Sequence, residues 1–596
     1  MPSSCDRVVV VASADHVNAI GLTDGKLHPR LVAECDERFL QSGPDVPSRD
    51  SRFVLIDTVG KAPARRGPSG AKVPGGPRFS PRLRGLKIVD NGRGFCNEYL
   101  VDMNSATQRL RAGEKIGYAL GDLAANLIFQ TLVTFLAFFY TDVYRIPPSA
   151  AATLIFIVGL LGAFVFTPVM GLIADRTRTR WGKFRPWILW TAIPFGALSL
   201  LAFSTPDLGA HGKIVYALVT YTLLVMIYVA NNLPYSALSG VLTGSMAERN
   251  SLSSYRFVAV MIAQFVIQVL LLPLVLILGD GDKARGFERT MALFAIVGSL
   301  FFLITFFTTK ERIVPAPEQR SSIRQDLADL ARNRPWLVML ALTILVFVNL
   351  ALKGGMYVYY FKYYLDAAQL ARFLDGIGFN AFIAGLNHAL VGAGLTEFQW
   401  PKDAPTSAFS LFNAGGIIFM IIGIGFSKPL ADRFGKRDVF GGALFVSTLC
   451  LLAFWFYSPQ SIGLVVGSYI LHGFFYGITI PLLWAMIADV ADYSEWKNHR
   501  RATAIVFSAM LCGLKFGLSL GGSLVAAILA AYGYDATLPT QGPEVVHGIQ
   551  LAVSVYCSIP FLLGVALLFG YELDKSMETR IERDLGARRV GAATPA

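Results

Sequence analysis

Long apolar runs recur along the chain from Ile116 onward and constrain the fold more than any other feature of the sequence. Each is about 20 residues long, the length that an α-helix needs to cross the hydrocarbon core of a bilayer. The chain is only 16% charged, whereas soluble proteins average about 25%. The sequence therefore predicts an all-α integral membrane protein with twelve transmembrane helices. The predicted spans are residues 117–140, 150–174, 187–204, 214–240, 256–278, 291–309, 336–364, 408–427, 438–457, 461–489, 502–531 and 548–573.

The basic residues gather in short loops between the apolar runs. In Pro168–Trp187 (PVMGLIADRTRTRWGKFRPW) an apolar run ends near Asp175, and several Arg and Lys precede the next run. Short cytoplasmic loops carry the Lys/Arg excess of membrane proteins, so we expect this loop and both termini in the cytoplasm. Topology explains the net charge of +12. Because the basic residues form no continuous face, we expect no nucleic-acid partner.

Paired motifs indicate two six-helix halves. Leu172–Gly182 (LIADRTRTRWG) follows the second span, and Leu430–Arg437 (LADRFGKR) follows the eighth. Likewise Met246–Phe257 follows the fourth span, and Val490–Arg501 follows the tenth. Corresponding elements in two halves are typical of transporters built from parallel repeats, in which the substrate binds between the halves.

These boundaries predict the domain organisation. The longest connections are a charged linker between the sixth and seventh spans and an outer insertion between the seventh and eighth, which we interpret as a lid or a packed subdomain. The predicted parts are an N-terminal extension 1–105, a first half 106–309, a cytoplasmic linker 310–335, a second half 336–575 with the outer insertion 366–406, and a cytoplasmic tail 576–596.

The N-terminal extension differs from the rest in being charged and rich in Pro and Gly, which predicts a disordered tail. Val8–Ala12 and Phe53–Ile56 have the composition of strands, but nothing near them is long enough for a core. Met103 is a second plausible start of translation, so the alternative is that residues 1–102 are not translated. A chain beginning at Met103 is then expected to transport as well as the full chain.

No constellation of catalytic residues is recognisable in the sequence. The six cysteines are scattered without a CxxC spacing, so we expect neither a disulfide framework nor a metal site. The histidines are scattered as well, and no Gly-rich phosphate loop follows a strand. We therefore expect no enzyme, no cofactor and no metal.

Four stretches resemble a known family. They are Gly117–Asp142 (with GYALGD and FFYTDV), Pro168–Trp187, Leu233–Arg256 (with LPYSAL and ERNSLSSYR) and Ala488–Lys515 (with ADVADYSEWKNHRRA). They are similar to the major facilitator superfamily (MFS), and specifically to its glycoside–pentoside–hexuronide:cation symporters, the group of melibiose permease. The resemblance covers roughly residues 115–575, and DRTRTRWGKFRPW is its most specific part. It implies the MFS fold and secondary transport of a sugar by alternating access.

The resemblance also implies a substrate site. The sugar-binding Asp of the first helix falls on Asn126, one turn beyond Asp122. The Lys of the eleventh helix is retained as Lys515, and the Arg that follows the fourth helix is retained as Arg256.

The family's cation site is not retained. Its two Asp of the second helix fall on Ala163 and Thr167, and that of the fourth helix falls on Asn232. Sodium prefers several hard oxygen ligands, and these side chains supply no carboxylate. We therefore expect coupling to protons through Asp122, or no coupling, rather than coupling to sodium.

Polar groups inside the spans are functional candidates, because a charge at the bilayer centre costs at least about 2.5–3.5 kcal/mol. Lys515 is expected to contact the substrate or, alternatively, to pair with Asp122 across the halves. Lys353 is either buried or snorkels to the outer end. The side-chain amides of Asn126 and Asn232 can hydrogen-bond to sugar hydroxyls or, alternatively, to neighbouring helices. The alternative for Asp122 is a helix-packing role, with its carboxylate hydrogen-bonded to neighbouring backbone. Two lysines favour an anionic substrate such as a uronide, with its carboxylate at Lys515.

Charged residues at the inner helix ends predict gates between the two halves. Asp175, Arg176 and Arg180 are expected to form the gate of the first half. The gate of the second half is expected at Asp489, Asp492, Glu495, Lys497 and Arg501. The alternative is that these residues only position the loops at the membrane surface.

The leading hypothesis is a secondary carrier of a sugar, glycoside or hexuronide, expected to work as a monomer in the lipid of a bacterial inner membrane. A second is a lipid or lysolipid transporter on the same fold. A third, from another class, is a polytopic sensor that binds its ligand without moving it. Transport assays separate the first two by substrate, and a sensor would show binding without flux.

Overall fold

The computed structural model describes residues 109–243, 246–312, 330–392, 400–401, 403–498 and 503–593, together with four strands nearer the N-terminus. The chain divides into two compact units, Met1–Asn104 and Ser105–Ala596.

The first unit contains a four-stranded antiparallel sheet with the order β3-β2-β1-β4. The strands are β1 (Arg7–Ala12), β2 (Val17–Thr23), β3 (Lys26–Leu27) and β4 (Arg52–Ile56). Val10 of β1 pairs with Ala19 of β2 and with Val54 of β4. Both apolar runs that the sequence marks as possible strands are therefore strands. The remainder of the extension, including Met103, lies outside the described residues.

The second unit is helical, and its spans fall where the apolar runs predict them. The first half contains α2 (Ala112–Phe138) with η3 (Phe139–Val143); α3 (Pro148–Leu161) with η4 (Gly162–Phe166) and α4 (Thr167–Arg176); α5 (Arg185–Ala202); α6 (Ala210–Leu242); α7 (Met246–Phe265) with η5 (Val266–Leu270) and α8 (Leu271–Leu278); and α9 (Lys283–Thr308).

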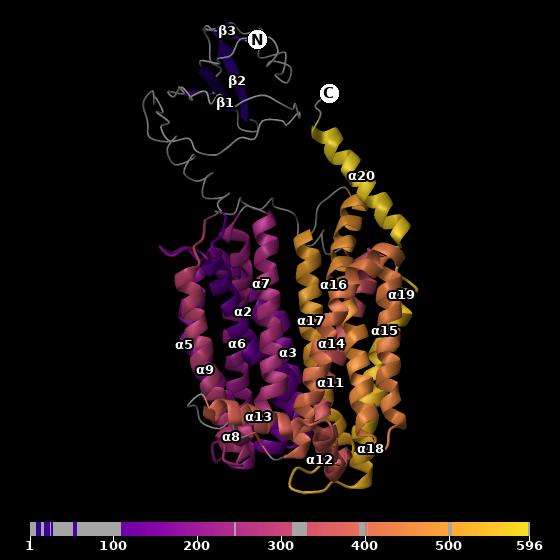
Figure 1. Cartoon of the computed structure of the whole chain (residues 1–596). Helices are drawn as coiled ribbons and strands as arrows, with labels where there is room; N and C mark the ends of the chain where they lie inside the picture. The colour runs from indigo at the N-terminus through magenta and orange to yellow at the C-terminus, as the bar shows by residue number, and fades with distance from the viewer. Residues whose placement is uncertain are drawn as a thin grey trace. The chain divides into compact units, whose positions relative to one another are not determined.

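The second half repeats this pattern. It contains α11 (Arg334–Tyr359) with η6 (Tyr360–Tyr364); α14 (Ala404–Phe434); α15 (Lys436–Leu452) with η7 (Ala453–Phe456); α16 (Ile462–Asn498); α17 (Thr503–Ala531); and α18 (Pro543–Leu551) with η8 (Ala552–Tyr556) and α19 (Cys557–Leu568). The two halves lie side by side, the first in indigo to magenta and the second in orange to yellow (Figure 1).

Eleven of these spans in the described part of the chain are long and apolar enough to cross a membrane. The twelfth is α5, which has 18 residues and contains Pro186, Pro194, Trp187 and Trp190. It packs between α6 and α9 and so completes the first half. The prediction of twelve transmembrane helices in two halves is confirmed.

Five spans contain a π-helical segment of five residues: η3, η4, η5, η6 and η8. A π turn accommodates one extra residue and is frequent at functional sites. Two of them occupy matching positions, since η3 ends the first span and η6 ends the seventh. We call the end of the bundle with η3 and η6 the outer end, following the orientation that the Lys/Arg distribution predicts, and the opposite end the inner end.

Short helices lie outside the bundle. The outer insertion contains α12 (Ala367–Gly376) and α13 (Phe379–Gly392), and residues 393–399 and 402 lie outside the described part. The predicted tail is largely a helix, α20 (Lys575–Ala593), at the inner end (Figure 1). The linker is described only at residues 310–312 and from 330 onward.

Candidate functional site

The most buried carboxylate of the predicted site, Asp122, forms an ion pair with Arg256. The Arg256 Nε lies 2.9 Å from the Asp122 Oδ2, and Asp122 is only 4% exposed. The pair joins the inner third of α2 to α7. An ion pair with excellent geometry is one of the few ways to hold charge in a dry interior.

Two tyrosines hold the guanidinium in place. Tyr118 and Tyr235 stack with their ring centroids 4.6 Å apart, and Arg256 lies over both rings, at 5.8 and 5.3 Å from their centroids. Each tyrosine hydroxyl donates to the other's backbone carbonyl, at 3.1 and 2.7 Å. This frame fixes the position of Arg256 by stacking and cation–π contacts.

Asn126 extends the same polar patch towards the middle of the membrane. Its amide donates to the Asp122 carbonyl oxygen at 2.9 Å and lies 3.3 Å from the Asp122 Oδ1. The structure therefore brings together Asp122, Asn126 and Arg256, which the sequence predicts separately. A neighbouring carboxylate, amide and guanidinium offer the acceptors and donors that sugar hydroxyls need.

Lys515 lies elsewhere, at the contact between the halves. Its ammonium donates to the Thr167 hydroxyl at 2.7 Å, and that hydroxyl donates to the Gly162 carbonyl, also at 2.7 Å. The alternative that Lys515 pairs with Asp122 is wrong, because Arg256 is the partner of that carboxylate.

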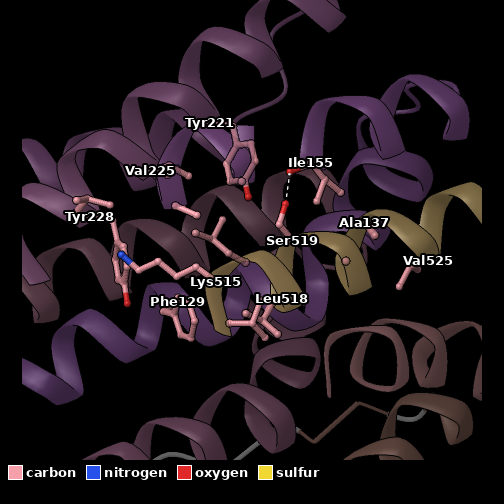
Figure 2. Close-up of a pocket in the computed structure, with 17 residues that line it drawn as sticks. Phe129, Ala137, Ile155, Tyr221, Val225, Tyr228, Lys515, Leu518, Ser519 and Val525 are labelled. Carbon is pink, nitrogen blue, oxygen red and sulfur yellow. Dashed lines mark hydrogen bonds between the residues drawn. The ribbon is translucent and has the colours of Figure 1, made fainter. Parts of the chain in front are cut away.

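A cavity of about 110 Å³ lies beside Lys515. It is lined from both halves, by α2, α3, α6 and α17, and Figure 2 shows the Lys515 side chain extending along it beside Tyr228. Its other lining side chains are mostly apolar, including Phe129, Leu518 and Val225. Ala163 is part of this lining, while Thr167 lies at its edge through Lys515.

The two halves meet tightly next to this cavity. The Ser519 hydroxyl lies 3.3 Å from the Ile155 carbonyl oxygen of α3 (Figure 2). A Cβ at Gly159 would lie 1.9 Å from the Ser519 hydroxyl. Glycine is therefore required here for α3 and α17 to approach, as small residues are at many helix contacts in membranes.

Asn232 stands where the family has the Asp of its fourth helix. Its side chain is half-buried and makes no hydrogen bond to the described residues. The neighbouring Asn231 is buried, and its amide donates to the Thr191 hydroxyl at 2.7 Å. A role for Asn232 in binding thus stays a prediction.

At the outer end the halves are joined by charge. The Asp142 Oδ1 of η3 lies 2.5 Å from the Lys362 Nζ of η6. It also accepts from the Tyr363 hydroxyl at 3.2 Å, and that hydroxyl lies 2.9 Å from the Tyr534 hydroxyl. The Asp142 side chain is 2% exposed and that of Lys362 is 32% exposed.

Aromatic packing reinforces this outer contact. The Thr141 hydroxyl lies 2.6 Å from the Tyr359 hydroxyl. The Phe138 ring meets the Tyr359 ring edge to face at 5.7 Å, and the Phe135 ring meets the Phe409 ring at 6.1 Å. These contacts close the outer end between the halves.

The described contacts of the residues predicted as inner gates all lie within one half. In the first half, Arg176 and Arg180 are exposed, and the Arg180 guanidinium lies 4.6 Å from the Trp181 ring centroid. Asp175 belongs to α4, but its side chain lies outside the described set. Its role as a gate stays a prediction.

In the second half, Asp489 pairs with Lys436 at 2.5 Å, and Lys436 also lies 3.4 Å from Glu578. Asp492 is exposed, and the Lys497 ammonium lies 5.6 Å from the Tyr493 ring centroid. Arg501 lies outside the described residues. These described contacts tie α16 to α15 and α20, all within one half.

The basic loop after the second span has a structural explanation. Glu311, just past α9, accepts three backbone N–H groups at the start of α5, from Lys183, Phe184 and Arg185, at 2.8, 2.7 and 2.9 Å. Gly182 precedes them with φ of +113°, and a Cβ there would clash with the Glu311 carboxylate. A carboxylate at a helix N-terminus is stabilised by the helix dipole.

Sequence reasoning missed Asp142, Lys362 and Glu311 as structural residues. Their partners lie more than a hundred positions away along the chain, so no local pattern reveals them. Each is a charged residue at the end of an apolar run, and that position is the only signal the sequence contains.

Comparison with known proteins identifies relatives along most of the chain. Residues 117–391 and 404–575 match the family described as MFS/sugar transport protein. The inner membrane symporter YicJ of Escherichia coli (strain K12) is 36% identical over 463 residues, which are 78% of this chain and 92% of YicJ. The isoprimeverose transporter of Lactiplantibacillus pentosus is 32% identical, over 79% of this chain and 91% of the transporter.

Solved structures agree on the fold. A bacterial homologue of the human lysosomal transporter Spinster, in an inward-facing and unoccupied conformation, aligns with a TM-score of 0.51 and 13% identity over 79% of this chain and 98% of its own. A peptide transporter POT in complex with sulfate aligns with a TM-score of 0.52 and 10% identity, over 79% of this chain and 97% of its own. The chain belongs to the glycoside–pentoside–hexuronide:cation symporters of the major facilitator superfamily and is a secondary sugar transporter.

Proposed function

We propose that this carrier moves a glycoside or hexuronide inward by alternating access, coupled to protons or uncoupled, and that Asp122, Asn126 and Arg256 bind the sugar. The single observation that supports this site is the Asp122–Arg256 ion pair, held at 2.9 Å between stacked tyrosines inside a span. Hydroxyls of a sugar would hydrogen-bond to the carboxylate and the guanidinium.

Support for the substrate class comes from the names of relatives. The putative glycoside/cation symporter YagG of Escherichia coli (strain K12) is 35% identical, and the glucuronide carrier protein homolog of the same organism is 27% identical. These names favour sugar transport over the lipid-transporter and sensor hypotheses. We also propose a monomer in a bacterial inner membrane, with both termini in the cytoplasm, as the basic inner loops favour.

Coupling to sodium is disfavoured by the surroundings of Lys515. Its ammonium already donates to the Thr167 hydroxyl, and the adjacent cavity has a mostly apolar lining with the methyl of Ala163. A sodium ion there would meet a positive charge and few oxygens. We propose Asp122 as the carboxylate that takes up and releases the coupling proton during the transport cycle.

Uptake into proteoliposomes tests this function. A panel of xylosides, glucuronides and galactosides is offered with a sodium gradient, a proton gradient or neither. Proton-driven accumulation, lost in Asp122→Asn but kept in the exposed control Asp438→Asn, is the expected result for a symporter. Equilibration without accumulation indicates an uncoupled carrier. Sodium-driven accumulation would overturn the proposed coupling, and no flux of any sugar would overturn the substrate class.

A further inference from the structure

A second polar cluster lies inside the second half, and the site above does not use it. The Lys353 Nζ of α11 lies 2.7 Å from the His472 Nε2 of α16. Both side chains are buried, with exposed fractions of 6% and 1%. Lys353 therefore does not snorkel to the outer end, which was one of its two sequence interpretations.

The hydrogen bonds fix where the charge lies. The His472 Nδ1 lies 2.8 Å from the Ser447 hydroxyl, which can donate or accept, and 3.0 Å from the Ser447 carbonyl oxygen, which can only accept, so we assign the ring proton to Nδ1. The Nε2 is then the acceptor, and Lys353 donates to it. The ring is neutral in this arrangement, and the cluster carries one positive charge, on Lys353.

That charge has no described counter-ion. Among the described residues no carboxylate pairs with Lys353, whose ammonium also lies 4.7 Å from the centroid of the Tyr476 ring. The hydroxyl of Tyr357, one turn further along α11, is buried without a hydrogen-bond partner in the described part of the chain. A lone charge inside a membrane protein costs free energy and marks a functional site by default.

A small cavity adjoins this charge and is lined from both halves. The second half contributes Lys353, Tyr357, Asn413 and His472. The first half contributes Thr134 of α2, Gln264 of α7 and Gln268 of η5. The amides and hydroxyls around one ammonium can each donate a hydrogen bond to an anion.

We infer that Lys353 forms a subsite for the acidic group of an anionic substrate, a carboxylate on a glycoside. This inference rests on the proposed function and names its substrate class. Lys515, which the sequence favours for this role, already donates to Thr167 beside a mostly apolar cavity. Lys353 has more polar neighbours, and its charge is compensated by none of the described carboxylates.

The spacing along the helices sets the length of the ligand. Thr134 lies eight residues beyond Asn126 on α2, and Gln264 lies eight residues beyond Arg256 on α7. At about 1.5 Å per residue each separation is about 12 Å. A single pyranose does not span it, whereas a uronide with a second ring does, with its acid towards the outer end.

A matched pair of probes tests the subsite. 2-O-α-D-Glucuronosyl-D-xylose and 2-O-α-D-glucosyl-D-xylose, a glucuronide and a glucoside of the same neutral sugar, differ only in a carboxylate against a hydroxymethyl group. We expect the full-length protein in proteoliposomes to favour the glucuronide about tenfold in KM, as one charge-assisted hydrogen bond predicts. Lys353→Met should abolish this preference while glucoside uptake persists. Lys353→Arg should restore part of it, and Lys515→Met should leave it in place.

Three results would overturn the inference: no preference in the wild type, equal losses for both probes in Lys353→Met, or loss of the preference in Lys515→Met alone. Replacing chloride with methanesulfonate tests whether Lys353 binds a free anion instead of the substrate's carboxylate. If it does, uptake of the glucoside would depend on chloride through Lys353. That result would also contradict the inference. Thermal unfolding in detergent separates this test from transport. Stabilisation by sodium glucuronate over sodium chloride, lost in Lys353→Met, would support the subsite even if no sugar moved.

Discussion

At the outer end of the interface the two halves are bonded to each other, whereas at the inner end every ion pair between described side chains joins elements of one half. Asp142 and Lys362 form the outer bond. At the inner end Lys115 pairs with Glu248 in the first half at 2.9 Å, and Lys436 pairs with Asp489 in the second. The two halves are therefore held together at the end with η3 and η6 by contacts that a transport cycle must break.

Breaking the outer bond should have the largest effect. Asp142→Asn leaves the Lys362 ammonium, whose side chain is 32% exposed, without its counter-ion, which costs about 2 kcal/mol, less than for a fully buried pair. That shifts the equilibrium towards the outward-open state about thirtyfold. We expect strong labelling of a cysteine introduced at Thr134 by an impermeant reagent added outside, in a variant without native cysteines.

The matched control for this change is Asp535→Asn, in an exposed outer loop that pairs with no described lysine or arginine. The exchange Asp142→Lys with Lys362→Asp should restore closure. If Asp142→Asn stayed closed to the reagent, the ion pair would not be what holds the outer end.

A wedge between the halves should act next most strongly. Gly159→Val places methyl groups where the Ser519 hydroxyl now lies, and overpacking of this kind costs about 1–3 kcal/mol. We expect uptake to fall about tenfold with normal membrane insertion. Gly240→Val is the control, because a Cβ at Gly240 meets no atom within 4 Å. Equal effects of the two substitutions would show that helix propensity, and not the contact between α3 and α17, is responsible.

Loss of an inner contact inside one half should affect stability alone. Glu311→Gln keeps the shape of the cap on α5 but removes its charge, which costs about 1 kcal/mol. The thermal unfolding midpoint in detergent should fall, while outside labelling at position 134 stays as in the wild type. Glu288→Gln, an exposed carboxylate on α9, should change neither. Increased outside labelling in Glu311→Gln would mean that the inner loop also controls the outer end.

The smallest effect concerns pH at the inner end. Burial, aided by the charge of Asp489, raises the pKa of Glu578 above its ordinary value of 4.5, whereas the hydrogen bond from Lys115 lowers the pKa of Glu248. A raised pKa stabilises the folded state below the unfolded value, and this stabilisation is lost as pH rises through the folded pKa. The effect of Glu248 has the opposite sign: its contribution to the stability of the folded state is present above pH 4.5 and is lost as pH falls below that value.

The attachment of α20 through Glu578 should therefore loosen as pH rises. A spin label at position 583 should become more mobile between pH 5 and pH 8. Glu578→Gln should abolish this dependence, whereas Glu572→Gln, at an exposed pair with Arg334, should leave it unchanged. A label equally mobile at both pH values in the wild type would contradict the assignment.

The sequence predicts the spans and the halves well, because the length and polarity of a run decide whether it can cross a bilayer. It also predicts Asp122, Asn126 and Arg256, which the structure brings together. It does not predict that Lys353 meets His472, because 119 residues separate them and the pairing depends on how α11 packs on α16. For the same reason it assigns Asp122 a possible partner in Lys515, where the packing of α7 supplies Arg256.

The π-helical segments of the first and seventh spans make the outer closure sensitive to chain length. Each residue of an α-helix turns the chain by about 100°, and a π turn absorbs one residue more than an α turn. Deleting one residue before η3 would turn the Asp142 carboxylate by about 100° away from Lys362 if η3 stayed π-helical, whereas conversion of η3 into regular helix would absorb the deletion. The gain or loss of a single codon could thus retune how long the carrier stays closed, with every contacting side chain unchanged.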